Sequence, residues 1–307
     1  MPSERASRYL AALLLDWLNQ RYGAEFRVSD GEPLVATDGA RRIGLAVAPL
    51  WEEDAAWDER LRAAEERLGA AGLAGAYLLW VPPRAPVPID EPSGSRFVER
   101  VIAAAGPLAP GAATEVTFPV TIKLAKLREE GGYASVVGGL SRWWTRVTEN
   151  VQGTFAVDAT AVHRLTRDGG AREELWATIG RLSNGIEVGQ SAEFEIEEAW
   201  TLQRLPDGEA NGWALAGAPP NIDPTDGILV RRMARKRLAA ANETLAALDV
   251  ELRALGFLGA YEYAEVETAS GTIKAVDPSL YARTAILSLL VDGEVKPVFA
   301  PQVFPWS

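Results

Sequence analysis

The sequence contains no cysteine and only one histidine among its 307 residues. Without cysteine, the chain can form no disulfide, thiolate metal site or cysteine nucleophile. A single imidazole is too few for a metal site or catalytic centre built on two or more histidines. No apolar run reaches the 18 residues or so that a membrane-spanning helix needs. These absences exclude several classes of enzyme and predict no membrane span.

Basic residues are also scarce, because 31 Lys and Arg face 42 Asp and Glu, for a formal net charge of −11. This balance argues against a surface that binds phosphate backbones over its whole extent, but it is compatible with one local basic patch. Asp16 and Asn19 interrupt the first apolar segment, so we expect no signal peptide and a cytoplasmic location. Hydrophobic residues make up 48% of the chain, which is ordinary for a globular protein.

The first 81 residues predict a regular order of elements. Apolar residues at three- and four-residue spacing indicate a helix from Glu4 to Tyr22 that Gly23 ends. Alternating and apolar runs then predict three short strands, a charged helix and a fourth strand, at residues 25–29, 33–37, 43–50, 52–71 and 76–81. Such an order predicts an α/β domain in which helices flank one mixed sheet.

This order over residues 4–81 resembles the core of the PD-(D/E)XK nucleases, which have the restriction-endonuclease-like fold. In that family a Pro-Asp pair opens the second strand, and the third strand carries an acidic residue, one spacer and a lysine. The resemblance implies a divalent metal, held by the carboxylates, that generates hydroxide for phosphodiester cleavage. In this chain Leu34 stands after Pro33, and Ala46 and Ala48 fall on the acidic and lysine positions. The resemblance therefore implies a scaffold that has lost its catalytic residues.

An alternative is an active nuclease that uses displaced carboxylates. Asp30, Glu32 and Asp38 are the candidates, and only this alternative calls for Mg²⁺; otherwise we expect no cofactor. Carboxylates at turns usually hydrogen-bond to the local backbone, so the structural interpretation of these three is favoured. An unrelated α/β layer with the same order of elements is a further alternative.

Two proline-containing loops, residues 82–91 and 106–113, flank a predicted helix at 96–105. We place the domain boundary here, with an α/β domain over residues 1–105 and an α+β domain over residues 114–307. The second domain is expected to hold an antiparallel sheet and one long helix. Its predicted elements are strands at 115–127, 153–165, 192–202 and 213–216, a helix at 173–182, and two hairpins at 261–276 and 286–299.

A glycine-rich segment from Gly131 leads into a predicted helix at residues 140–151. It lacks the Gly-Lys-Ser/Thr ending of a phosphate loop, so the structural interpretation is a turn that feeds a helix. The functional interpretation is a binding lip formed by Arg142, Trp143, Trp144 and Arg146. Two adjacent tryptophans on a helix cannot both face one core, so one of them is expected at a second interface.

The strand at 192–202 carries alternating glutamates on one side, and Glu198 alone breaks its apolar side. A solvated, edge-protecting role is the expected one for the alternating glutamates. The single histidine, His163, has no Gly-x-Ser-x-Gly elbow or obvious carboxylate partner and is interpreted as structural.

The long helix is predicted to start within residues 221–226 and to extend as far as Leu255. Its first half carries the one basic patch of the chain, Arg231, Arg232, Arg235, Lys236 and Arg237. The structural interpretation is a solvated helix face whose basic side chains pair with the glutamate-rich strand. The functional interpretation is that these basic side chains contact nucleic acid or an acidic protein.

The sequence as a whole favours a non-catalytic binding or assembly module that resembles an inactivated nuclease. Two alternatives remain open: an active metal-dependent nuclease, and an interaction module with no link to nucleic acid.

Overall fold

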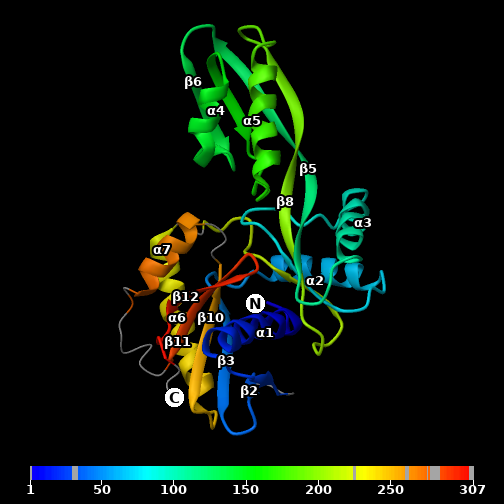
Figure 1. Ribbon diagram of the computed structural model, residues 1–307. Coiled ribbons are helices and arrows are strands. Elements are labelled where there is room, and N and C mark those ends of the chain that lie inside the picture. Colours follow the sequence, from blue (N-terminus) through cyan, green and yellow to red (C-terminus); the bar gives the residue numbers. More distant parts are fainter. Residues whose placement is uncertain are drawn as a thin grey trace. The chain divides into compact units, whose positions relative to one another are not determined.

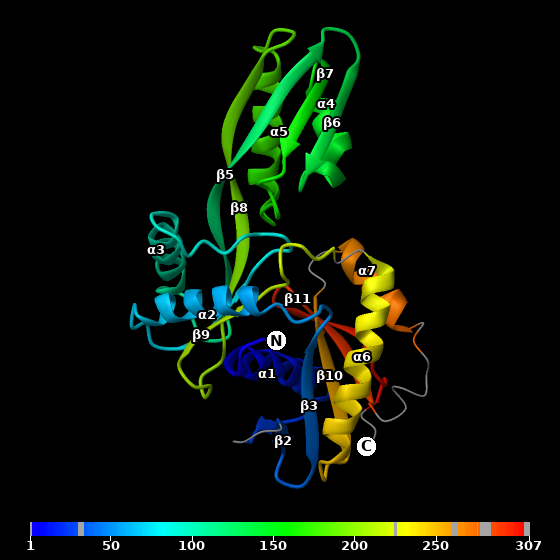
Figure 2. The same ribbon diagram turned by 180° about the vertical axis from the view of Figure 1, so that it is seen from behind.

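The computed structural model describes residues 2–29, 34–223, 226–259, 263–274, 276 and 284–303. The chain forms two compact units (Figures 1 and 2). The first unit combines residues 1–114 with 201–307, and the second unit consists of residues 115–200. The second unit is therefore an insertion within the first.

The first unit is built around a six-stranded mixed sheet with the order β1-β2-β3-β10-β11-β12. Its strands are β1 (Arg27–Val28), β2 (Val35–Thr37), β3 (Arg42–Pro49), β10 (Leu252–Leu258), β11 (Ile286–Val291) and β12 (Glu294–Phe299). β10 is parallel to both β3 and β11, whereas the outer pairs are antiparallel. The centre of the sheet therefore joins a strand from the start of the chain to strands from its end.

Helices cover both faces of this sheet, as Figure 1 shows. They are α1 (Glu4–Tyr22) on one face, and α6 (Gly227–Ala246) and α7 (Tyr263–Lys274) on the other. Leu10 and Leu14 of α1 pack with Ile43 of β3, and all three side chains are fully buried. Met233 and Leu238 of α6 pack on the opposite side with the aromatic and aliphatic residues of β10 and β11.

A second layer of the first unit is formed by β4 (Ala76–Trp80), β9 (Gly212–Ala216), α2 (Ala55–Gly69) and α3 (Ser93–Ala105). β4 lies between two strands, parallel to β9 and antiparallel to the last residues of β8 (Ser191–Arg204). Every residue of β4 is buried, which explains its continuous apolar sequence. The indole N–H of Trp57 on α2 donates to the carbonyl of Gly217, 3.0 Å away, and fastens this helix beside β9.

The second unit is built on β6, β7, β5 and most of β8, in that order, and these strands belong to one six-stranded sheet that continues with β4 and β9. Its remaining elements are β5 (Ala113–Arg128), β6 (Gly132–Gly138), the 3-10 helix η1 (Ser141–Trp143), α4 (Trp144–Asn150), β7 (Gly153–Ala159) and α5 (Gly169–Ser183). β6 is parallel to β7, and β7 is antiparallel to β5. Val147 of α4 and Ile179 of α5 pack on Phe155 of β7, so the helices cover one face of the sheet.

The structure confirms a mixed α and β architecture in which helices flank the sheets. It also confirms several predicted elements, including the helix Glu4–Tyr22 and the hairpin at 286–299. The compact units separate between Thr114 and Glu115, next to the predicted boundary, and again between Trp200 and Thr201. Residues 201–307 therefore belong to the first unit, where β3 pairs with β10. The predicted single N-terminal sheet is also wrong, since β4 joins the layer of β8 and β9 rather than that of β3.

Three further corrections concern the end of the chain. The long helix ends at Ala246, and Leu252 and Leu255 belong to β10. The predicted hairpin at 261–276 is wrong where it is described, because residues 263–274 form α7. The strand at 213–216 departs from the expected antiparallel sheet, since it pairs parallel with β4, which separates it from β8. Among the described residues, no helix is long and apolar enough to cross a membrane.

Candidate anion-binding face

The basic patch lies on α6, and Asp226 caps the N-terminus of this helix. The Oδ1 atom of Asp226 accepts hydrogen bonds from the N–H groups of Ile228 and Leu229, at 2.9 and 3.2 Å. This is an N-terminal cap, which satisfies backbone donors that the first turn of a helix leaves unpaired. One side of α6 is buried against the sheet through residues such as Met233 and Leu238. The other side is exposed and basic.

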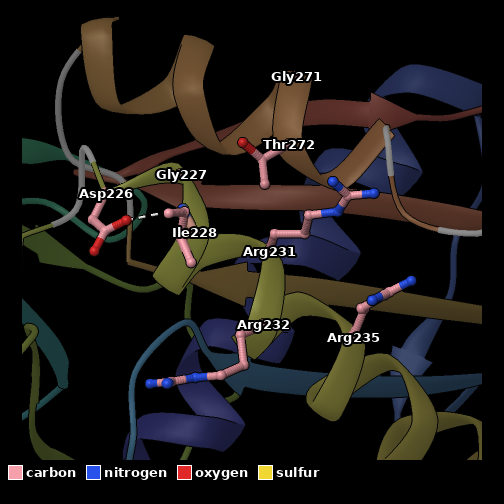
Figure 3. A pocket seen from close by; sticks show the side chains of 8 residues that line it. All are labelled: Asp226, Gly227, Ile228, Arg231, Arg232, Arg235, Gly271 and Thr272. Carbon is pink, nitrogen blue, oxygen red and sulfur yellow. Dashed lines mark hydrogen bonds between the residues drawn. The ribbon is translucent and has the colours of Figure 1, made fainter.

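An open hollow of about 1150 Å³ lies on this outer side, between the first half of α6 and the last turn of α7 (Figure 3). The residues that line it are Asp226, Gly227, Ile228, Arg231, Arg232, Arg235, Gly271 and Thr272. Figure 3 shows that Arg231 and Arg235 extend to one side of α6 and that Arg232 extends to the other. The three guanidinium groups are thus spread along the helix. Ile228, 84% exposed, places an apolar side chain among them.

The predicted basic patch separates into two groups. Arg231, Arg232 and Arg235 line the hollow, whereas Lys236 and Arg237 do not. The guanidinium of Arg237 is buried and donates to the carbonyls of Pro49 and Trp51, at 3.3 and 3.0 Å. Its role is structural, because it satisfies backbone acceptors just after β3.

Lys236 forms an ion pair with Glu52, with 2.8 Å between Nζ and Oε2. The hydrogen bond from Lys236 lowers the pKa of Glu52, and the charges of Arg232 and Arg237 lower it further, against a smaller opposing effect of burial. A carboxylate at this edge of the face is therefore stabilised in its charged form. The same surroundings favour negative charge on a ligand placed beside Arg232.

The four predicted residues of the glycine-tryptophan segment are divided between two environments in the second unit. Trp143 is half-buried against Trp176, with ring centroids 5.8 Å apart, and the guanidinium groups of Arg142 and Arg172 lie 5.6 and 5.5 Å from its ring. Trp144 is 50% exposed. Arg146 pairs with Glu149 one turn later on α4.

The positions that correspond to the nuclease residues do not meet at one place. Leu34 lies opposite Leu45, whose N–H donates to the Leu34 carbonyl at 2.8 Å, and it packs with the α1 side of the sheet. Ala46 and Ala48 pack with the α6 side. Alternate residues of a strand face opposite sides of a sheet, so Leu34 and the two alanines are separated by the sheet.

Of the three displaced carboxylates, Asp30 and Glu32 lie outside the described residues. Asp38 accepts hydrogen bonds from the backbone N–H groups of Ala40 and Arg41 and from the guanidinium of Arg41. The hydrogen bond from the Arg41 side chain is the main reason that the pKa of Asp38 is lowered. This is the local role expected of a turn carboxylate. Within the described part of the chain, no three acidic or histidine side chains gather in a way that would suit a metal ion.

His163 has a carboxylate partner that the sequence did not identify. Oε2 of Glu198 lies 2.6 Å from the backbone nitrogen of His163 and 2.9 Å from its Nδ1, while Oε1 accepts from the Trp200 indole at 2.6 Å. Glu198 is 3% exposed. The one available signal was that Glu198 breaks the apolar side of its strand. The arrangement supports a structural role for His163, in which Glu198 fastens the loop after β7 to β8.

Comparisons with known proteins supply no family for this chain. No protein-family model matches it, and neither does any curated protein or solved structure. The resemblance to nucleases therefore stays a prediction. The candidate functional site is the arginine face, formed by Arg231, Arg232 and Arg235 along the hollow beside α6.

Proposed function

We propose that this chain is a non-catalytic, cytoplasmic binding module that holds a nucleic acid through Arg231, Arg232 and Arg235. The observation that carries the proposal is the exposure of three guanidinium groups along one open hollow in a chain of net charge −11. Nucleic-acid affinity depends chiefly on basic side chains that replace counterions along the phosphate backbone. The acidic remainder of the chain confines that affinity to this face.

The spread of the guanidinium groups suits an extended anion better than a small one. Arg231 and Arg235 are one turn apart, or about 6 Å along the helix axis, and Arg232 extends to the opposite side. A single phosphate contacts one or two such groups, whereas a nucleic acid backbone can contact all three. The N–H groups of Ile228 and Leu229 are already bonded to Asp226, so side chains supply the contacts in place of the helix terminus.

A salt titration of oligonucleotide binding, followed by fluorescence anisotropy, tests the proposal. For R232E/R235E we expect at least a tenfold loss of affinity and a shallower dependence of log K on log[salt]. Each lost phosphate contact removes about 0.9 from that slope for duplex DNA and about 0.7 for a single strand. The matched control is R27E/R96E, which makes the same change of charge at two other exposed arginines of the first unit. Equal losses in the two variants would show a general charge effect and contradict a dedicated face.

The ion pair between Lys236 and Glu52 shows that this side of α6 also accepts a carboxylate. An acidic protein is therefore the second candidate partner. Polyaspartate competing with the oligonucleotide at equal charge concentration would favour an acidic protein. Competition only at a large excess of polyaspartate would favour nucleic acid, whose phosphates bind Arg in the bidentate geometry.

A further inference from the structure

β6 is an edge strand of the second unit, and the structure describes every residue of that unit. One long side of β6 faces β7, and no strand of the unit pairs with the other side (Figure 1). From Gly131 to Ser141 the sequence contains no charged residue and no proline. Edge strands usually carry such residues, because these discourage pairing with another chain. β6 lacks that protection.

The surroundings of this edge are apolar. Tyr133 and Val137 project from β6 on the face that the helices leave uncovered, and they are 52% and 50% exposed. On the helix side, the hydroxyl of Thr148 accepts a hydrogen bond from the N–H of Ala134 at 3.2 Å, so this flank of α4 lies against the edge. Trp144 is four residues before Thr148 and shares that flank. Its half-exposed indole therefore lies beside β6.

The backbone groups at this edge form a defined pattern. The N–H of Gly139 donates to the carbonyl of Ala159 at the end of β7, whereas the N–H of Ala134 turns away from β7 toward Thr148. Because directions alternate along a strand, Ala134, Val136 and Gly138 face the open edge. Thr148 occupies one of their donors. The remaining groups are the N–H of Val136 and Gly138 and the C=O of Ala134, Val136 and Gly138.

We propose that β6 pairs antiparallel with β6 of a second copy of this chain, about a two-fold axis at Val136. In that register the N–H of Val136 meets the C=O of the other Val136, and the N–H of Gly138 meets the C=O of the other Ala134. Four hydrogen bonds thus join the two copies in the self-complementary pattern that a two-fold interface requires. The C=O of Gly138 lies opposite the N–H of Ala134 that Thr148 occupies, so it takes no part in the pairing. Ser135 and Val137 of opposite copies become cross-strand neighbours. The proposed interface contains no charged residue, so pairing brings no like charges together although each chain has a net charge of −11.

Sedimentation velocity over a range of concentrations tests this pairing. S135K/V137K places lysine opposite lysine, as S135E/V137E places glutamate opposite glutamate, and like charges directly across a pair of strands are destabilising. We expect each variant to associate at least tenfold more weakly than the wild-type protein. An equimolar mixture of the two should associate again, as a heterodimer. L127K is the matched control, because Leu127 is an equally exposed apolar residue on β5, away from the edge.

Hydrogen exchange of the wild-type protein locates the contact. The amides of Val136 and Gly138 should become slower to exchange as concentration rises, and the already bonded amide of Ala134 should change less. A wild-type chain that stays monomeric would overturn the proposal. A dimer that the paired variants do not weaken, or that leaves these two amides unchanged, would overturn it as well. The test is independent of nucleic-acid binding, which uses the first unit.

Discussion

The carboxylate of Glu65 on α2 accepts a hydrogen bond from the backbone N–H of Leu215 on β9, at 2.9 Å, across 150 residues of sequence. β9 is the outermost strand of its layer, and this N–H has no strand neighbour to donate to. The hydroxyl of Ser3 donates to the same oxygen at 3.2 Å. Glu65 is 7% exposed, and burial raises its pKa, although the hydrogen bonds from Leu215 and Ser3 counter part of that effect.

The raised pKa predicts a pH-dependent difference between the wild-type protein and Glu65→Gln. A carboxyl group whose pKa is higher in the folded state stabilises the fold fully below its unfolded pKa, near 4.5, and this contribution is lost as pH rises through the folded value. Glutamine keeps an acceptor for Leu215 and does not titrate. Urea unfolding at a series of pH values should therefore show the wild-type protein losing stability relative to the variant as pH rises above about 4.5. Parallel pH profiles would contradict this expectation.

Arg237 and Arg235 are two residues apart, and we expect their substitutions to have opposite consequences. Arg237→Ala leaves the carbonyls of Pro49 and Trp51 buried without their donor and should destabilise the fold by about 2–4 kcal/mol. Arg235→Ala should change the free energy of unfolding by less than about 0.5 kcal/mol but weaken oligonucleotide binding. Chemical denaturation and anisotropy on the same two proteins separate these effects. Equal effects on stability would contradict the division of the basic patch.

Local sequence patterns predict the elements that are stabilised by contacts between residues close together in the sequence. Gly23 ends α1 in the left-handed conformation, with φ of 62°, and its N–H bonds to the carbonyl of Asn19. The hairpin of β11 and β12 turns at Asp292 and Gly293, whose φ angles of 46° and 89° are those of the tight turn that the Asp-Gly pair favours. In both cases residues adjacent in sequence supply the contacts.

Which strands pair with each other was not predictable from local sequence in the same way. The apolar run of β4 fits any fully buried strand, and only contacts distant in sequence place it between β8 and β9. The α7 segment predicts a hairpin when Ala269-Ser-Gly is interpreted as its turn, although Ala269 and Ile273, four apart and both buried, follow a helical period. The proline-containing loop at 106–113 signals the start of the inserted unit, but its end leaves no local signal, because it falls inside β8.

The sequence located the arginine face only in part. Arg231, Arg232 and Arg235 were predicted and do line the hollow. Arg237 belongs to the same basic run of sequence but not to the exposed face. Its place four residues after Met233, on the buried side of α6, was the helical signal that separates it from the others.

Gly138 and Gly139 are expected to be structural, as in the interpretation of this segment as a turn that feeds a helix. A Cβ atom on Gly138 would lie 2.1 Å from the carbonyl oxygen of Ala159, and one on Gly139 would lie 2.1 Å from that of Val162. Gly138→Ala and Gly139→Ala should each destabilise the protein by about 1–3 kcal/mol or more. Gly132→Ala, at a position with nothing within 4 Å, is the control and should be close to neutral in thermal unfolding. A neutral Gly139→Ala would contradict the observed packing.

The proposed loss of nuclease chemistry predicts that the purified protein does not cleave plasmid or oligonucleotide in Mg²⁺ or Mn²⁺. Leu34, Ala46 and Ala48 offer no oxygen ligand, and the sheet separates the first from the other two. Gel assays over a range of metal concentrations provide the measurement. Metal-dependent cleavage that persists in Leu34→Arg would contradict the prediction. D30N/E32Q/D38N would then show whether the displaced carboxylates are responsible, because a nuclease that depends on them should lose its cleavage while keeping its oligonucleotide affinity.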